Sequence, residues 1–220
     1  MVLIFDLDDT LYDEMSFVTS GLHAVASFGE SLFGWEEGES FEFMHATLQK
    51  NGRGKVFDEW LRAKDRHTRT LVARCVNVYR HHNPNIALFP IAKQVLELYE
   101  RKCHLYLVTD GHKDVQENKV NALQIATLFK RIFITHRFGI RHAKPSLHCF
   151  EIIRRAERCE WIDMVYVGDN PAKDFVNLNA VGAQTVRVST GSHSSVVAHP
   201  HYDARITIPD LSYLQNVLDQ

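Results

Sequence analysis

The chain has 220 residues, of which 45% are hydrophobic, and its formal net charge at neutral pH is -2. This length and composition suffice for one domain with an insertion or for two small domains. The basic residues are dispersed, so nothing favours binding to nucleic acid or to an anionic membrane surface. No apolar run approaches the roughly 20 residues that span a bilayer, and a candidate strand begins at the second residue, where a secretory signal would need a basic region. We therefore expect a soluble, cytoplasmic protein without a membrane partner.

The first part of the chain predicts one strand followed by a set of helices. Val2–Phe5 is a short apolar run that ends abruptly in acidic residues, as expected of a buried strand. From about residue 14 to residue 83 the pattern is helical, with Ser40 as the expected N-cap of the second helix and Gly52 as its end. A third helix is expected near residues 56–63. This segment resembles a separate helical layer.

The second part of the chain alternates between helix and strand. The expected order is helix 91–99, strand 104–108, helix 115–123, strand 132–135, helix 147–156, strand 164–167, helix 175–181, strand 185–188 and helix 211–218. Such alternation predicts an α/β fold, a mainly parallel sheet covered by helices on both faces. The first strand belongs to this sheet, so the helical segment is an insertion. We place the core domain in residues 1–13 and 89–220 and the helical domain in residues 14–88.

The only loop-rich stretch of this second part is 189–204, which we interpret as a surface connection. It carries several of the 13 histidines, among them the pair in His199-Pro200-His201. Neither this pair nor His81-His82 has the spacing of a zinc site, so surface positions are expected for them. The four cysteines are widely spaced and are expected to be reduced.

Polar residues recur where the predicted strands end. Asp6 and Asp8 follow the first strand, Thr109-Asp110-Gly111 follows the second, and Gly168-Asp169 follows the strand at 164–167, with Asp174 shortly after it. Lys144 stands before a helix. Each of these is also ordinary turn or capping chemistry when taken alone. Their ordered recurrence favours a site, because ligands of parallel sheets bind at the carboxyl ends of the strands.

These residue types fit phosphoryl transfer. A carboxylate that attacks a phosphate monoester forms a mixed anhydride, and this requires a cation near the phosphate and a group that protonates the leaving oxygen. Four acids against one lysine leave an excess of negative charge. A divalent cation would offset it, so we expect Mg²⁺ as a cofactor.

At these positions the chain resembles the haloacid dehalogenase-like hydrolase superfamily. The run from Asp6 to Thr10 matches the first motif of that family, Thr109 the second, Lys144 the third, and Asp169 with Asp174 the fourth. The resemblance implies a Rossmann-like core. The helical insertion after the first motif resembles the C1 cap of subfamily I, in which the cap closes over the phosphate ester and selects the leaving group.

The resemblance also implies a role for the residues of the first and fourth motifs. Asp6 would be the nucleophile, and Asp8 would first protonate the leaving group and then activate water. Mg²⁺ would be held by the Asp6 carboxylate, the main-chain carbonyl of Asp8 and Asp169, with Asp174 on the metal or next to it. Asp9 has no assigned role.

Phosphate binding is the implied role of a second group of residues. Thr109 and Lys144 would bind phosphoryl oxygens, assisted by main-chain N–H groups. The positions that would supply these groups or orient the loop are Leu7, Asp8, Thr10, Asp110 and Gly111. Many relatives carry Asn where this chain has Asp110, so we expect the main chain of Asp110 to act while its carboxylate points away. His112 and Lys113 are candidates to offset its charge.

Substrate specificity is expected in the helical domain. Arg53 stands between glycines and could bind a carboxylate or a second phosphate of the substrate, although an exposed arginine in a turn is the alternative. Phe17, Phe41 and Trp60 are candidates for a leaving-group pocket, but aromatic residues at helical spacing also form cores.

We therefore predict a Mg²⁺-dependent phosphatase acting on a small soluble phosphate monoester. Dehalogenation is disfavoured, because relatives with that activity lack the second aspartate of the first motif. A sugar-phosphate mutase and a catalytically silent binding protein on the same fold remain alternatives. Neither the physiological substrate nor the oligomeric state follows from the sequence.

Overall fold

The structure, a computed structural model, describes residues 1–219 and divides the chain into two compact units. Of the described residues, 1–14 and 87–219 belong to the core unit, and 15–86 form the helical unit. The boundaries expected from the sequence lie after residue 13 and after residue 88. No helix of the described residues is long and apolar enough to cross a membrane.

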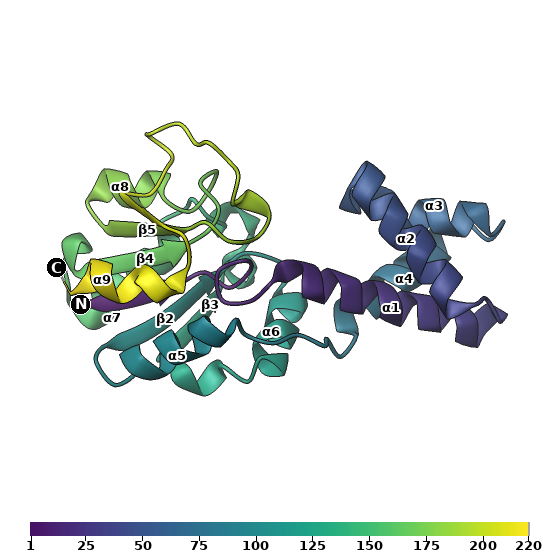
Figure 1. Ribbon diagram of the computed structural model, residues 1–220, viewed down its shortest axis with the longest axis horizontal. Coiled ribbons are helices and arrows are strands. Elements are labelled where there is room, and N and C mark those ends of the chain that lie inside the picture. The colour runs from purple at the N-terminus through teal and green to yellow at the C-terminus, as the bar shows by residue number, and fades with distance from the viewer. Residues whose placement is uncertain (220) are drawn as a thin grey trace. The chain divides into compact units, whose positions relative to one another are not determined.

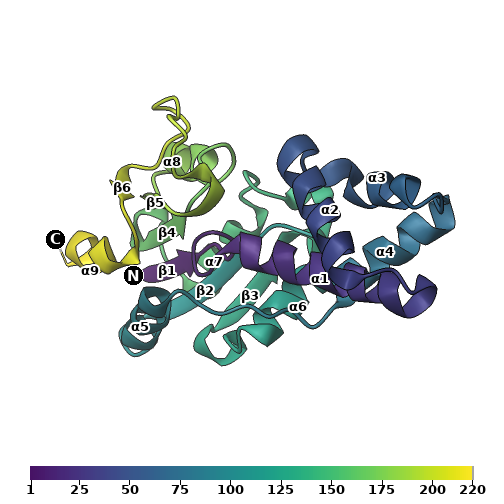
Figure 2. The same cartoon turned by 45° about the vertical axis from the view of Figure 1, so that its right-hand side comes forward.

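A six-stranded sheet forms the centre of the core unit, and its order is β3-β2-β1-β4-β5-β6. The strands are β1 (Val2–Phe5), β2 (His104–Thr109), β3 (Arg131–Ile134), β4 (Met164–Gly168), β5 (Gln184–Val188) and β6 (Ile206–Ile208). All neighbouring strands pair in parallel. Figure 2 shows β1 between β2 and β4. The carboxyl ends of these three strands therefore lie side by side.

Helices cover both faces of this sheet, as the sequence predicted (Figure 1). They are α5 (Pro90–Tyr99), α6 (Lys113–Ala122), α7 (His148–Glu157), α8 (Val176–Val181) and α9 (Leu214–Leu218). Successive strand residues point to opposite faces, and Val2 and Ile4 share one buried cluster with residues of α7 and α8. Because both faces are covered, β1 is buried at all four positions, which explains its uninterrupted apolar sequence.

The edge strand β6 was not predicted from the sequence. Two of its three residues, Ile206 and Thr207, are exposed, so it has no buried apolar run to mark it. It pairs with β5 through the register Val186↔Ile206.

The helical unit contains four helices around a core of its own. They are α1 (Glu14–Phe33), α2 (Glu37–Asn51), α3 (Val56–Ala63) and α4 (Arg69–His81). Trp60 is buried in this core, and Phe41 packs against its edge. Phe17 stacks edge-on against Tyr79. All three aromatic residues thus have packing roles within the unit.

One expected helix boundary was wrong. The N-cap of α2 is Glu36, whose carboxylate accepts hydrogen bonds from the main-chain N–H groups of Gly38 and Glu39. Ser40 is buried inside the helix instead. A glutamate is a less common cap than serine, which is why the pattern pointed to Ser40. Gly52 does end α2, at φ 72°, where a side chain would be strained.

Candidate active site

Three strand ends bring the predicted polar residues together. Asp6 follows β1, Thr109 is the last residue of β2, and Asp169 follows β4. All three are buried. The main-chain N–H of Asp6 donates to the carbonyl of Val167, which links the loop after β1 to the end of β4.

A group of three acids lies at this point. The carboxylates of Asp6, Asp169 and Asp174 each offer an oxygen, and these atoms lie within 4.8 Å of one another. Burial, together with the negative charge of Asp174, raises the pKa of Asp6 to about 6 in spite of a nearby lysine. Burial and the charges of Asp6 and Asp174 raise the pKa of Asp169 to about 9. The group therefore resists full ionisation unless positive charge is added.

Lys144 supplies one positive charge to this group. Its Nζ lies 2.9 Å from Oδ1 of Asp6 and 2.7 Å from Oδ1 of Asp174, and its side chain is 1% exposed. Burial disfavours the ammonium, but the two carboxylates outweigh it and raise the pKa of Lys144 above its ordinary value. Lys144 is thus a permanent cation beside Asp6.

Tyr166 belongs to the same network and was not predicted from the sequence. Its hydroxyl accepts a hydrogen bond from Lys144 Nζ at 2.8 Å and donates to Oδ1 of Asp174 at 3.2 Å. The residue lies within β4, where an aromatic in an apolar run is typical of a core position. Nothing in the local pattern distinguishes it from one.

The three acids suit a magnesium ion. Mg²⁺ prefers oxygen ligands and is usually held by one or two carboxylates plus water and phosphate. Protein groups hold both carboxylate oxygens of Asp174. Oδ1 contacts Lys144 and Tyr166, as described above, and Oδ2 accepts a hydrogen bond from the main-chain N–H of Asn170 at 2.9 Å. The raised pKa values of Asp6 and Asp169 indicate that Lys144 alone does not offset the negative charge of the three carboxylates. A bound divalent cation would supply the missing positive charge.

Asp8 has a different environment from Asp6. Its Oδ1 accepts from the Tyr12 hydroxyl at 2.6 Å and lies 2.6 Å from Nζ of Lys119, while its Oδ2 accepts from Nε2 of Gln116 at 2.9 Å. Burial opposes ionisation here, but Lys119 and the hydrogen bonds outweigh it and lower the pKa of Asp8. Asp8 is therefore an ionised, firmly oriented carboxylate.

Helix α6 contributes two site residues that sequence reasoning missed. Gln116 and Lys119 are three positions apart, so they share one face of the helix, and both are buried. Gln116 Nε2 also donates to Oγ1 of Thr109 at 2.6 Å, which connects Asp8 to the end of β2. The available signal was the pairing of a Gln and a Lys on the inward face of a helix that begins directly after a predicted site strand.

Asp110 uses its carboxylate for internal contacts. Oδ1 accepts from the Thr135 hydroxyl at 2.6 Å and from the main-chain N–H of Lys144 at 3.1 Å. Nζ of Lys173 lies 3.5 Å from Oδ2. Burial raises the pKa of Asp110, but the charges of Lys144 and Lys173 and the hydrogen bonds outweigh it and lower that pKa. His112 pairs with Asp114 instead.

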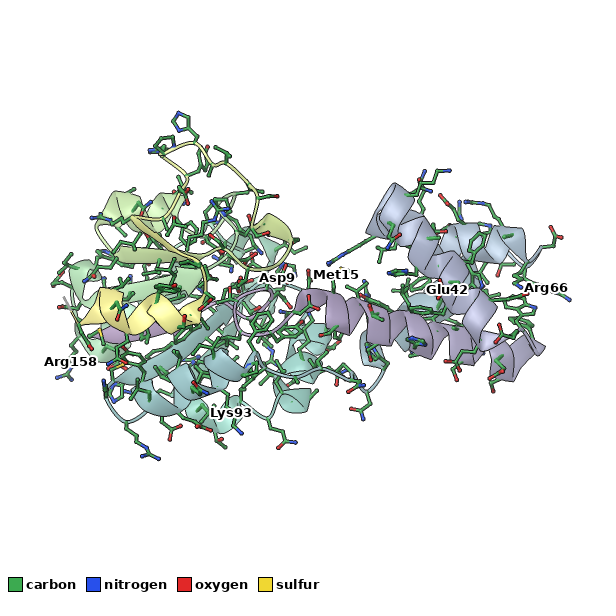
Figure 3. The ribbon with its side chains drawn as sticks, viewed as in Figure 1. Asp9, Met15, Glu42, Arg66, Lys93 and Arg158 are labelled. Atoms are coloured by element: carbon green, nitrogen blue, oxygen red, sulfur yellow. The ribbon has the colours of Figure 1, made fainter. Side chains whose placement is uncertain are left out.

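The segment after β5 is more than the expected surface connection. Ser192 donates to Asp9, and Nδ1 of His193 lies 2.9 Å from Oδ2 of Asp169. Asp9 is labelled in Figure 3 in the loop that follows β1. The turn residues of this segment gave no periodic signal that would have linked them to the site.

The remaining predicted residues differ in what surrounds them. The carbonyl of Leu7 accepts from the main-chain N–H of Leu11, within the loop after β1. The Thr10 hydroxyl is buried without a hydrogen-bond partner among the described residues. Gly111 adopts φ 142°, and a Cβ there would lie 3.0 Å from the Gln116 side chain. Arg53 lies in the helical unit, in the turn Arg53–Lys55, and its role stays a prediction.

Curated relatives match nearly the whole chain. A glyceraldehyde 3-phosphate phosphatase from Methanocaldococcus jannaschii is 27% identical over 224 residues, covering 98% of this chain and 96% of the relative. An enzyme of the same name from Pyrococcus furiosus is 25% identical over 232 residues, covering 100% of this chain and 93% of the relative.

Solved structures show the same fold. The putative hydrolase YfnB of Bacillus subtilis, described as bound to magnesium, has a TM-score of 0.73 at 17% identity and covers 100% of this chain and 98% of its own. A 2-haloacid dehalogenase from Pseudomonas syringae has a TM-score of 0.68 at 21% identity, covering 99% and 97%. A family model described as haloacid dehalogenase-like hydrolase matches residues 3–188. The chain belongs to the haloacid dehalogenase-like hydrolase family.

Proposed function

We propose that the protein is a Mg²⁺-dependent phosphatase that hydrolyses a small phosphate monoester through an aspartyl-phosphate on Asp6. One observation carries the proposal: a buried carboxylate, Asp6, lies beside a permanent cation, while a second carboxylate two residues later is held separately. The first arrangement suits a nucleophile that faces a phosphate dianion. The second suits a group that moves a proton.

The metal would be held by Asp6, Asp169 and Asp174, whose oxygens converge. When bound, Mg²⁺ would neutralise charge on the phosphoryl oxygens and on Asp6. Lys144 adds a further positive charge at the same place, and the hydroxyl of Thr109, which Gln116 orients, is a candidate ligand of the phosphate.

The reaction would run in two displacements. Asp8 is ionised in the free protein, so it would first take up a proton from solvent as the phosphate binds. In the first displacement, an oxygen of Asp6 attacks phosphorus, the bond from phosphorus to the ester oxygen breaks, and that oxygen takes this proton from Asp8. In the second, Asp8 accepts a proton from water, the water oxygen attacks phosphorus, and the bond to Asp6 breaks. Phosphate leaves, Asp6 is again a free carboxylate, and Asp8 holds the proton taken from water, which it returns to solvent or keeps for the next turnover.

The substrate class that we propose is a small sugar phosphate. The two curated relatives described above both carry the name glyceraldehyde 3-phosphate phosphatase, and the matches extend over nearly the full length of each chain. At 25–27% identity this supports glyceraldehyde 3-phosphate as the first compound to test. Asp8 favours a phosphatase over a dehalogenase, since a leaving halide needs no proton.

Phosphate release tests the proposal. The full chain should hydrolyse p-nitrophenyl phosphate and glyceraldehyde 3-phosphate with Mg²⁺, and kcat/KM should be compared with that for glycerol 3-phosphate and 2-phosphoglycolate. We expect Asp6→Asn to reduce kcat by at least roughly 10³-fold, because it removes the nucleophile. The matched control Asp65→Asn alters an exposed aspartate in the helical unit and should keep full activity.

Two results would overturn the mechanism. Activity that survives Asp6→Asn would exclude Asp6 as the nucleophile. Activity that persists in excess chelator would exclude a required divalent cation.

A further inference from the structure

We propose that His193 is a positioning residue of the metal centre: it binds one oxygen of Asp169 and turns the other toward the cation. The inference rests on the proposed metal centre. The inference also assigns a function to the segment after β5 and to Asp9, neither of which takes part in the chemistry described above.

Hydrogen bonds hold the segment 190–193 against Asp9. Oδ2 of Asp9 accepts from the main-chain N–H of Ser192 at 2.9 Å and from its hydroxyl at 2.8 Å. The hydroxyl of Thr190 donates to the main-chain carbonyl of Asp9. Oδ1 of Asp9 accepts from the main-chain N–H of Glu14 at 2.9 Å. Both carboxylate oxygens of Asp9 are thus used by protein donors, as expected of an anchor rather than of a free ligand.

Gly191 allows this close approach. It adopts φ +64°, and a Cβ at this position would lie 2.1 to 2.4 Å from the side-chain atoms of Asp9. Any larger residue would have to displace the Asp9 carboxylate, which is buried. The geometry of the turn therefore depends on glycine at this point.

Arg187 holds the other side of the same segment. This residue of β5 is buried, and its guanidinium donates to the carbonyl of His193 at 2.7 Å and to the carbonyl of Val196 at 2.9 Å. The main chain of His193 is consequently fixed from both directions, by Asp9 through Ser192 and by the sheet through Arg187. A fixed main chain gives the imidazole a defined position.

The imidazole is placed against Asp169. Nδ1 of His193 lies 2.9 Å from Oδ2 of Asp169, and the His193 side chain is 34% exposed, whereas that of Asp169 is 5% exposed. With a proton on Nδ1, the ring donates to this oxygen and leaves Oδ1 for a cation. Hydrogen bonds to ligating carboxylates orient them in this way, and their loss commonly weakens metal binding by about 10- to 100-fold.

Direct ligation by His193 is the competing interpretation, because Asp9, Asp169 and His193 also offer atoms within 4.8 Å of one another. The two interpretations differ in metal preference. Imidazole nitrogen favours Zn²⁺ and Ni²⁺, while an all-oxygen set favours Mg²⁺ and Mn²⁺. Loss of a direct ligand would therefore weaken Zn²⁺ binding more than Mn²⁺ binding.

Metal binding by the full chain tests the proposal without reference to turnover. Mn²⁺ affinity is measured by electron paramagnetic resonance, Mg²⁺ affinity by competition with Mn²⁺, and Zn²⁺ affinity with a chelating dye. We expect His193→Ala to raise the Kd for Mn²⁺ and Mg²⁺ by about 10- to 100-fold. His193→Asn keeps a donor near the position of Nδ1 and should restore the Kd to within about threefold of wild type. His201→Ala, in the same loop, is the matched control and should bind as wild type does.

The melting temperature in chelator separates positioning from folding. The melting temperature of His193→Asn should equal that of the wild type. If His193→Ala is unstable, the metal affinity of His193→Asn therefore tests the positioning role. Three outcomes would overturn this inference but not the proposed function. They are equal metal affinity of wild type and His193→Ala, a selective loss of Zn²⁺ binding in His193→Ala, and a His193→Asn variant that binds Mn²⁺ no more tightly than His193→Ala does. A wild-type chain that binds neither Mg²⁺ nor Mn²⁺ would overturn the proposed function and this inference with it.

Discussion

Binding of Mg²⁺ should release about one proton at neutral pH. In the metal-free protein the pKa of Asp169 is raised to about 9 and that of Asp6 to about 6, in both cases chiefly because the carboxyl groups are buried. A carboxylate must be ionised to ligate the metal, so binding displaces any proton that it holds. At pH 7 Asp169 is therefore mostly protonated and Asp6 mostly ionised, whereas at pH 10 both are mostly ionised.

The sign of the pH dependence follows from these values. Because the metal-free folded protein holds the proton of Asp169 up to a high pH, protons compete with Mg²⁺ throughout the neutral range. Mg²⁺ affinity should therefore rise by up to about tenfold per pH unit between pH 6 and pH 9 and then level off. For the same reason, folding of the metal-free protein is favoured at low pH by these two groups, and this contribution is lost as the pH rises through about 6 and about 9.

Calorimetric titration in several buffers measures the proton count. The observed heat of Mg²⁺ binding is plotted against the ionisation enthalpy of the buffer, and the slope gives the number of protons released. We expect a slope near one at pH 7 and near zero at pH 10. A slope near zero at pH 7 would refute the reasoning, because it would mean that Asp169 is already ionised in the metal-free protein or does not bind the metal.

Two further predictions concern other charged groups. Replacing Lys119 by Met removes the cation that lowers the pKa of Asp8, so Asp8 should more often be protonated when it has to accept a proton from water in the second displacement. We expect kcat to fall by about 10- to 100-fold and the acid limb of the pH–kcat profile to move to higher pH; an unchanged profile would contradict this. Glu157 has a pKa of about 2, because hydrogen bonds from Lys130, Tyr106 and His104 outweigh its burial. Its contribution to stability is present above pH 4.5 and lost as the pH falls toward 2, so Glu157→Gln should destabilise the protein in urea at pH 6, with the difference from wild type shrinking below pH 4.5. A destabilisation equal at pH 6 and pH 3 would exclude this account.

The fold was predictable where a local pattern carries it. The strands β1, β2 and β4 are buried on both faces, so their sequences are apolar runs that end in polar turns, and helices lie between them. The edge strand β6 was missed because two of its three residues are exposed, so its sequence contains no buried apolar run. The N-cap of α2 was misplaced because a glutamate took the position that serine usually occupies.

The candidate site was predictable where its residues lie next to strand ends or, as for Lys144 and Asp174, match a family motif. Asp6, Thr109 and Asp169 satisfy that condition, and the structure brings their strand ends together. Lys119 and His193 do not, because Lys119 lies 111 residues from its partner Asp8 and His193 lies 24 residues from Asp169. The crossover connections of the fold create such pairs, so a short window of sequence does not show which distant residue is the partner.

Asp6 and Asp8 leave the same strand two residues apart, yet their surroundings shift their pKa values in opposite directions. Burial in the three-acid group raises the pKa of Asp6, while Lys119 and two hydrogen bonds lower that of Asp8. Opposite shifts of neighbouring carboxylates separate their chemical tasks. Asp6 requires added positive charge before it can attack phosphorus, which ties the nucleophile to cation binding. Asp8 is ionised in the free protein and must gain a proton before it can protonate a leaving oxygen. A phosphate dianion arriving beside it opposes its ionisation, so substrate binding itself would prepare Asp8 as the acid, and departure of the leaving group would prepare it as the base.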